Sequence, residues 1–301
     1  MNKYTSPLLF PVRLENDIIL VLDEIRLPFE EVFIPIRKIN EAIKILYEMR
    51  TRAFGQVLLF FYSAVIFKNK VPLDELASKF NKIRPTFDFP LLAELLKERL
   101  KKTKSIEVAV NDLILYFDTL RRARMKKLAK ILPNPANILT ICNVNGELIY
   151  LYEELKNFKK EAFFYILETR PYLQGTRLTF WELRKNNIPA KLICDNQIAT
   201  LMKKGLINSV VCGADRVTKK GDIINKIGTY PLARLAKYFN IPFYALTQYP
   251  KDIDVDTIQI EERPKDEVFM FLGKNHSSII EAIYPSFDIT KNEFITQCIE
   301  I

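Results

Sequence analysis

Residues 207–247 read INSVVCGADRVTKKGDIINKIGTYPLARLAKYFNIPFYALT and show how the second half of the chain is organised. A short apolar run at 207–213 is followed by a helix-like pattern at 225–239 and by a second apolar run at 241–247. Two buried strands that are joined through a helix form a parallel pair, because the crossover returns the chain to the same end of the sheet. The stretch therefore predicts a parallel α/β sheet.

The same alternation extends upstream from this stretch. The apolar runs NILTIC (137–142), EAFFYILET (161–169) and AKLICD (190–195) are each followed by a helix-like segment. Strands that are apolar along nearly their whole length are typical of a sheet covered on both faces. We therefore expect residues 132–301 to form a Rossmann-like α/β domain, with a mainly parallel sheet covered by helices.

Residues 1–131 have a different texture. Two short β-type runs between residues 17 and 37 predict a small hairpin or sheet. Residues 39–131 show helical periodicity. The proline-rich segment LPNPAN (132–137) marks the boundary between the two textures. We expect an α/β protein with a mainly helical N-terminal domain that carries a small β element and ends at residue 131.

The composition narrows the class of protein. The chain has 301 residues, of which 49% are hydrophobic and 27% charged, which is a soluble globular balance. Its net charge of +9 suits an acidic or phosphorylated partner. The densest basic cluster, RRARMKK (121–127), is interpreted as a solvated helix face or a domain junction, and because no nucleic-acid motif accompanies it we expect no nucleic-acid partner. The longest apolar run, 56–67, is too short to span a bilayer and predicts a core helix rather than a membrane contact.

The four cysteines are Cys142, Cys194, Cys212 and Cys298, and none of them form a C-x-x-C pair. This spacing argues against a zinc or thioredoxin-like site, so we expect no metal. Wide spacing in a long chain without a recognisable signal peptide predicts reduced thiols and a cytoplasmic protein. Cys194 and Cys212 lie within apolar runs and are expected to be packing residues.

Ligands of open parallel α/β sheets bind beyond the carboxyl ends of the strands. The residues that follow the expected strands are Cys142, Asn143, Glu168, Thr169, Arg170, Asp195, Asn196, Asp215 and Arg216. A thiol, arginines and several carboxylates should therefore meet at one edge of the sheet, with Asp215 in a crevice partly screened from water. Two plainer readings stay open, because a cysteine at a strand end can simply be a buried apolar residue and Asp215 can form a structural ion pair with Arg216.

Asn225 and Lys226 stand just before the expected helix at 227–239. A helix N-terminus offers free N–H groups and the positive end of a dipole, and both attract phosphate. The sequence has neither G-x-G-x-x-G nor G-x-x-x-x-G-K-[ST], so neither dinucleotide nor P-loop nucleotide binding is indicated. A compact phosphorylated molecule fits this pattern, and no cofactor is expected.

Four segments now identify a family. They are ETRPYLQGTRLTFWEL (168–183), GADRVTKKGDIINKIGTYPLARLAKYFNIPFYAL (213–246), IEER (260–263) and YPSFDIT (284–290). They resemble S-methyl-5-thioribose-1-phosphate isomerase of methionine salvage, whose superfamily includes the regulatory subunits of translation initiation factor 2B. The resemblance covers nearly the whole chain. It implies a homodimeric aldose–ketose isomerase that converts an aldose 1-phosphate into a 1-phosphoketose.

The resemblance also implies roles for particular residues. The cysteine of ILTICN and the aspartate of GADR match the family's catalytic pair, which makes Cys142 and Asp215 the candidate catalytic residues. A crevice of low dielectric raises the pKa of an aspartic acid, which allows it to act as an acid. The residues implied to bind the substrate phosphate are Arg84, Gln174, Asn225 and Lys226.

Two segments depart from the family pattern. At 49–56 the chain reads MRTRAFGQ where the family has R-G-A-P-A-I-G, so Arg50, and after it Arg52, is the candidate to replace the family's arginine. The cysteine loop reads CNVNGEL where the family has C-N-x-G-A-L, with one added residue and Glu147 in place of a small residue. A negative charge beside a phosphate weakens its binding, so we expect Glu147 to turn away.

These departures leave two alternatives beside methylthioribose 1-phosphate isomerisation. The chain can be an isomerase of another pentose phosphate, or a catalytically idle regulatory or metabolite-binding protein like the initiation factor 2B subunits. The presence of both Cys142 and Asp215 favours the enzyme.

Overall fold

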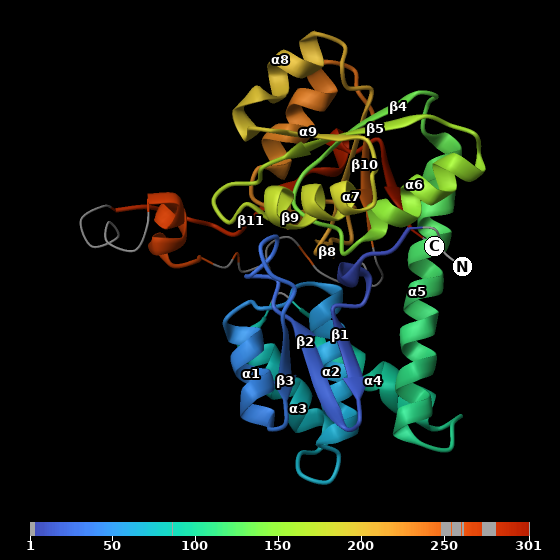
Figure 1. Cartoon of the computed structure of the whole chain (residues 1–301), viewed down its shortest axis with the longest axis vertical. Helices are drawn as coiled ribbons and strands as arrows, with labels where there is room; N and C mark the ends of the chain where they lie inside the picture. Colours follow the sequence, from blue (N-terminus) through green and yellow to red (C-terminus); the bar gives the residue numbers. More distant parts are fainter. Residues whose placement is uncertain are drawn as a thin grey trace. The chain divides into compact units, whose positions relative to one another are not determined.

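The structure is a computed structural model, and it describes residues 4–85, 87–247, 254, 260, 262–272 and 281–300. The chain forms two compact units (Figure 1). One consists of Met1–Arg122 with Asn145–Glu147, and the other of Ala123–Val144 with Leu148–Ile301. The division falls within helix α5 (Ile106–Ile131), whereas the boundary expected from the sequence lies at the end of that helix and stays a prediction.

The first unit contains a small antiparallel sheet in the order β1-β2-β3. Its strands are β1 (Val12–Glu15), β2 (Ile18–Leu22) and β3 (Phe33–Ile36). Asn16 and Asp17 join β1 to β2 with φ angles of 47° and 60°, the left-handed conformation that a two-residue hairpin loop requires. The small β element predicted from the sequence is therefore present.

Helices make up the rest of this unit: α1 (Ile39–Tyr47), α2 (Phe54–Ile66), α3 (Leu73–Ile83), α4 (Phe89–Leu100) and the first part of α5. Helix α2 packs against β1 and β2 and is buried along almost its whole length, as its apolar sequence predicted. It brings Phe60 into edge or tilted contact with Phe80 and Phe89 at the centre of the core. Within the described part of the chain, no helix combines the length and apolar character needed to cross a membrane.

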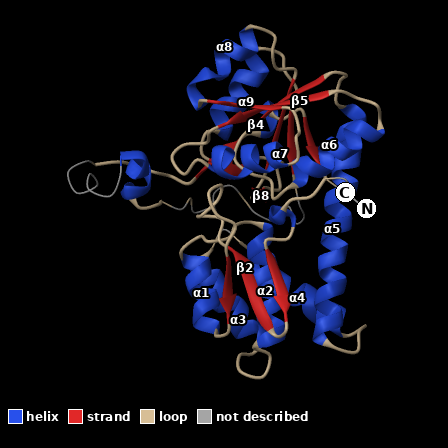
Figure 2. Ribbon diagram, viewed as in Figure 1, coloured by secondary structure: helices blue, strands red, loops and turns tan. Residues whose placement is uncertain are grey.

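The second unit is built on a six-stranded parallel sheet, which confirms the predicted fold class (Figure 2). Its strands, in the order β12-β10-β7-β4-β5-β6, are β12 (Gln297–Ile299), β10 (Phe243–Leu246), β7 (Ser209–Gly213), β4 (Ala136–Thr140), β5 (Ala162–Leu167) and β6 (Ala190–Ile193). Helices α6 (Glu147–Asn157) and α7 (Trp181–Lys185) lie on one side of the sheet, and α8 (Ile198–Lys203) and α9 (Thr229–Tyr238) on the other.

A second, antiparallel sheet in this unit was not anticipated from the sequence. It has the order β11-β9-β8 and consists of β8 (Arg216–Val217), β9 (Ile223–Lys226) and β11 (Phe287–Thr290). Strand β11 comes from far along the chain and pairs with all four residues of β9. Asn225 and Lys226 therefore lie at the end of a strand, and α9 begins only at Thr229.

One reading of the basic cluster at 121–127 and one cysteine prediction need correction. The division between the two units falls between Arg122 and Ala123, which fits the reading as a domain junction. The cluster is not simply a solvated face, because the side chains of Arg121 and Arg124 are buried while those of Lys126 and Lys127 are exposed. Arg124 donates a hydrogen bond to the carbonyl of Thr247 at 2.9 Å. Cys212 is buried in the central strand β7, as expected, but Cys194 is exposed because it follows the edge strand β6.

Candidate active site

The strand order defines a switch point between β4 and β7. From β4 the chain adds β5 and β6 on one side, and from β7 it adds β10 and β12 on the other. The loops that leave two such neighbouring strands diverge to opposite faces of the sheet and leave a crevice, which is where ligands bind in folds of this kind. Cys142 follows β4 and Asp215 follows β7, so the fold brings the loops of the two predicted catalytic residues to this point.

Cys142 is half-buried and has a left-handed main chain, with φ at 65°. Its N–H donates to Oγ1 of Thr169 at 2.9 Å, and its carbonyl accepts from Oγ1 of Thr179 at 2.6 Å. A residue other than glycine enters this region only where surrounding contacts enforce it, and such residues cluster at functional sites. Two threonine hydroxyl groups therefore hold the main chain of Cys142 on both sides.

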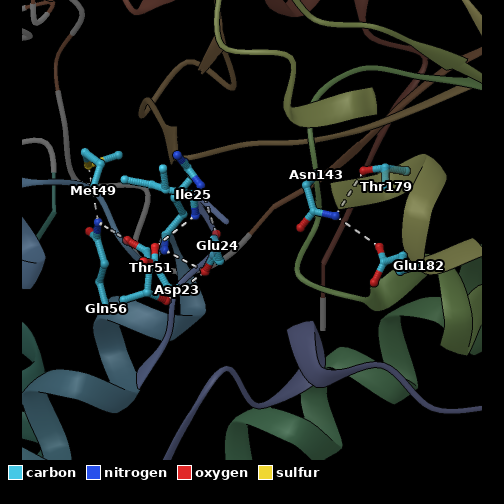
Figure 3. Close-up of polar contacts among 10 residues, drawn as sticks. Asp23, Glu24, Ile25, Met49, Thr51, Gln56, Asn143, Thr179 and Glu182 are labelled. Carbon is cyan, nitrogen blue, oxygen red and sulfur yellow. Dashed lines mark hydrogen bonds and ion pairs between the residues drawn. The ribbon is translucent and has the colours of Figure 1, made fainter. Parts of the chain in front are cut away.

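The loop after Cys142 is fixed by its next two residues. The side-chain amide of Asn143 donates to Oγ1 of Thr179 and to Oε1 of Glu182, both at 3.0 Å (Figure 3). Val144 lies over the end of β7, since a Cβ atom at Gly213 would be 3.3 Å from its Cγ1. The absence of a side chain at Gly213 lets this loop settle on the strand that leads to Asp215.

Glu147, which differs from the family pattern, is buried against an arginine. Its Oε1 lies 3.5 Å from Nε of Arg121, and both side chains are 5% exposed or less. Arg121 also donates to the carbonyls of Leu9, at 3.0 Å, and Asn145, and its guanidinium lies 4.4 Å from the ring centroid of Phe54. The negative charge that the sequence analysis identified as unfavourable for phosphate is therefore offset by a guanidinium.

Asp215 is exposed, whereas the sequence argument expected a carboxylate partly screened from water. Its main chain is fixed, because its N–H donates to the carbonyl of Ile224 at 2.9 Å. This bond aligns Asp215 with the β8–β9 hairpin and places it beside Asn225. The side chain of Asn225 is buried and donates to Oγ1 of Thr229 at 2.9 Å, while its Oδ1 lies 3.7 Å from the position of a Cβ atom at Gly213.

Lys226 is mostly buried, with 9% of its surface exposed. Its ammonium nitrogen lies 5.1 Å from the ring centroid of Phe287 and 5.8 Å from that of Tyr284, within the range of cation–π attraction. The two rings come from the segment around β11. The structure therefore brings Lys226 and Asn225 together on β9, next to the end of β7.

The N-terminus of α9, which was expected to attract phosphate, is occupied by Asp288 of β11. The N–H of Gly228 donates to its Oδ2 at 2.8 Å, and the N–H of Tyr230 lies 3.1 Å from both carboxylate oxygens. Burial raises the pKa of Asp288 to about 6, although these main-chain bonds and the charge of Lys226 act in the opposite direction. The side-chain carboxylate of Asp288 therefore occupies the place at the N-terminus of α9 where a phosphate was expected.

Gln174 combines burial with an incomplete set of hydrogen bonds. It is 3% exposed, and its Oε1 has no hydrogen-bond partner among the residues that the structure describes. Buried polar atoms are nearly always bonded, so an open acceptor here favours a ligand or water contact. The next residue must be glycine, because a Cβ atom at Gly175 would lie 1.7 Å from the carbonyl oxygen of Leu167. This close approach fixes Gln174 at the end of β5.

The arginines predicted to bind phosphate lie in the first unit. Arg84 is buried at the end of α3. The guanidinium of Arg50 contacts Asp23 at 2.6 Å and Glu48 at 2.8 Å, at the edge of a pocket of about 550 Å³. Arg50 therefore already has two carboxylate partners, and its role in substrate binding stays a prediction.

Arg52 is held by a buried carboxylate. Oε2 of Glu24 accepts from its guanidinium at 3.0 Å, and Oε1 accepts from its main-chain N–H at 3.0 Å. Oε1 of Glu24 also accepts from the Thr51 hydroxyl at 2.7 Å (Figure 3). Burial raises the pKa of Glu24, and the neighbouring charge of Arg52 opposes that rise. The substrate role of Arg52 also stays a prediction.

Thr169 was expected near the site as a residue that follows a strand, but the sequence assigned no site role to the other residues that hold it, namely Thr179, Glu182, Asp288 and Arg121. Thr179 and Glu182 are three residues apart in a helical segment, a spacing that places both on one face, and this signal could have paired them. Asp288 lies among the apolar residues of FDIT, which marks it as a carboxylate inside a strand. The local pattern carried no signal for the bond between Arg121 and the cysteine loop.

Comparison with known proteins identifies the family of the chain. The family model of the initiation factor 2 subunit family matches residues 80–300. A methylthioribose-1-phosphate isomerase from Sulfurihydrogenibium sp. is 35% identical over 96% of this chain and 91% of its own length. Another from Aquifex aeolicus is also 35% identical, over 95% of this chain, and this chain spans 66% of it.

Two solved structures share the fold. The 5-methylthioribose 1-phosphate isomerase from Pyrococcus horikoshii has a TM-score of 0.80 and 25% identity, over 100% of this chain and 94% of its own. The delta subunit of translation initiation factor eIF-2B from A. fulgidus has a TM-score of 0.74 and 26% identity, over 97% and 94%. The chain therefore belongs to the initiation factor 2 subunit family and, within it, to the methylthioribose-1-phosphate isomerase family.

Proposed function

We propose that the protein is an aldose–ketose isomerase that converts methylthioribose 1-phosphate into methylthioribulose 1-phosphate in methionine salvage. The observation that carries this proposal is the placement of Cys142 and Asp215 in the loops after two neighbouring strands, at the switch point of the parallel sheet. The names of the relatives and of the Pyrococcus horikoshii structure support the substrate.

The reaction requires three hydrogen movements. Phosphate on the anomeric oxygen locks the sugar ring, so the ring oxygen must receive a proton as its bond to C1 breaks. One hydrogen then moves from C2 to C1, and the C2 hydroxyl loses its proton as the ketone forms. Asp215 is the proposed acid at the ring oxygen, and Cys142 the proposed group beside C1 and C2. When the substrate binds over Asp215, it would shield the carboxyl group of this exposed residue from water.

The proposed substrate contacts in the second unit are Lys226, Asn225 and Gln174. The ammonium of Lys226 supplies charge, and the open Oε1 of Gln174 is placed to accept from a substrate hydroxyl group. Arg84, Arg50 and Arg52 are the proposed contributors from the first unit. From the family resemblance we also propose a cytoplasmic homodimer that needs neither nucleic acid nor a membrane as a partner.

A coupled turnover assay with several pentose 1-phosphates tests the proposal. The wild-type protein should turn over methylthioribose 1-phosphate fastest, and Asp215→Asn and Cys142→Ser should each lose at least ~10²-fold in kcat with little change in Tm. Asp74→Asn, which changes an exposed aspartate in the other unit, is the matched control and should stay active. Near-normal turnover by Asp215→Asn would refute its assignment as the acid.

The alternative is a catalytically idle protein that binds sugar phosphates. The carboxylate partners of Arg50 and Arg52 favour it, because each arginine would have to exchange a carboxylate for the phosphate. Calorimetric binding of methylthioribose 1-phosphate without any turnover by the wild-type protein would make this the better description.

A further inference from the structure

The contacts that surround Cys142 extend beyond the residues of the proposed reaction. We propose that Thr179 and Glu182 are positioning residues, which hold the main chain of Cys142 in its left-handed conformation and thereby direct its thiol. This inference rests on the proposed function only in taking Cys142 as the catalytic thiol. Neither Thr179 nor Glu182 is proposed to touch the substrate.

A directed chain of hydrogen bonds leads from Glu182 to Cys142. The two amide hydrogens of Asn143 go to Oε1 of Glu182 and to Oγ1 of Thr179. A threonine hydroxyl has one hydrogen to donate, and because Oγ1 of Thr179 accepts from Asn143, that hydrogen is directed at the carbonyl of Cys142. Bonds in such a chain polarise and strengthen one another in a buried setting, and both Thr179 and Glu182 are fully buried.

The amide side of Cys142 is held by a second set of contacts. Oγ1 of Thr169 accepts from the N–H of Cys142, and the N–H groups of Thr169 and Arg170 donate to the carboxylate of Asp195 at 2.9 and 2.7 Å. The left-handed conformation is strained for a residue other than glycine, so it persists only where its neighbours enforce it. The bonds on both sides of Cys142 provide that enforcement.

Thr179 and Glu182 lie in a helical segment with an irregular, π-helical start. Thr179 lies in a π-helical segment, Gly175–Phe180, and Glu182 lies in the first turn of α7 directly after it. The wide π-helical turn starts where Gly175 touches the end of β5, a contact that leaves no room for a side chain. Single π-helical turns occur frequently at functional sites, because they redirect side chains without ending the helix.

Paired substitutions at Thr179 test the proposal. Thr179→Val removes the hydroxyl at nearly constant volume, whereas Thr179→Ser keeps it. Thr179→Val should lower kcat by on the order of tenfold, because small displacements of a catalytic group are costly. KM should stay within about threefold, since no substrate contact is lost. Thr179→Ser should retain most of the wild-type kcat.

A second readout needs no sugar phosphate. Iodoacetamide alkylation of Cys142 is followed by mass spectrometry, with the exposed thiol of Cys194 as the internal reference. The ratio of the two rates should change in Thr179→Val and not in Thr179→Ser. Thr119→Val is the matched control, because it removes a threonine hydroxyl that donates to a carbonyl on the exposed side of α5, and it should change neither readout.

If Thr179→Val folds poorly, Glu182→Met removes the acceptor of Asn143 and should change the same two readouts. Wild-type kcat together with a wild-type alkylation ratio in the folded variants would overturn the proposal. An equal loss in Thr179→Ser and Thr179→Val would overturn it as well, because only the methyl group would then matter. If the wild-type protein turned over no sugar phosphate, the proposed function would be wrong. The alkylation ratio would still test whether Thr179 and Glu182 position Cys142.

Discussion

The loop at 49–55 and the cysteine loop at 142–147 each bury a charged side chain against a partner of opposite charge, with the signs reversed. In the first loop the guanidinium belongs to the loop, in Arg52, and the carboxylate of Glu24 lies outside it. In the cysteine loop the carboxylate belongs to the loop, in Glu147, and the guanidinium of Arg121 comes from α5. These are the two segments in which the chain departs from the family pattern.

The comparison shows that the charge of a loop residue says little about the charge that the loop presents to a ligand. Arg52 brings a positive charge that Glu24 offsets, and Glu147 brings a negative charge that Arg121 offsets. The sequence suggested a phosphate-binding arginine in one loop and an opposing carboxylate in the other. In the second unit, Lys226 stays the proposed source of positive charge for the phosphate, with Tyr284 and Phe287 beside its ammonium group.

The largest effect is expected at Arg121. Arg121→Met removes the guanidinium that faces the buried Glu147 and that donates to two carbonyl groups, so it should lower the free energy of unfolding by about 3 kcal/mol. Chemical denaturation measures this change. Arg122→Met, on the same helix but with a more exposed side chain, is the control and should cost less than about 1 kcal/mol. If both variants lost the same free energy of unfolding, the contact between Arg121 and Glu147 would contribute no more than an exposed ion pair.

A smaller effect is expected at Arg52. Arg52→Met should lower the free energy of unfolding by about 2 kcal/mol. Glu24 keeps its bond from Thr51, and because burial already raises its pKa it can take up a proton when the guanidinium is lost. The loss should therefore shrink at lower pH in denaturation experiments. Arg26→Met, which breaks an exposed pair with Glu30, should show neither the loss nor the pH dependence.

Asp288 sharpens the comparison further, because main-chain N–H groups rather than an arginine hold this third, half-buried carboxylate. Its pKa is raised from 3.8 to about 6, so the folded protein binds this proton more tightly than the unfolded chain does. Its stabilising contribution is fully present below pH 3.8 and is lost as the pH rises through about 6. Asp288→Asn should flatten this part of the stability profile, by on the order of 1 kcal/mol.

The measurement is the unfolding free energy of both proteins at several values between pH 4 and 7. The control is Asp74→Asn, whose exposed carboxylate should leave the profile of the wild-type protein unchanged. Parallel profiles for wild type and Asp288→Asn would show that the carboxyl group has the same pKa in the folded and unfolded chains.

The sequence predicted the parallel sheet because long apolar runs alternate with helical periodicity, and this signal is local. It could not predict the sheet formed by β8, β9 and β11, because β8 has only two residues and β11 pairs with β9 from a distant part of the chain. The loops of Cys142 and Asp215 could be placed at one edge from the rule for strand ends. The bonds that hold the Cys142 main chain depend on left-handed turns and a π-helical segment, which no residue pattern specifies.

Cys142 occupies a backbone conformation that asparagine and glycine adopt more readily than cysteine does. Selection for a stable fold alone would therefore replace the thiol. Under the proposed function, selection for chemistry keeps the thiol at this position at the expense of stability, the trade-off common to functional sites. A descendant freed from that selection should drift towards asparagine or glycine here, so the residue at this position can distinguish active members of the family from members that only bind.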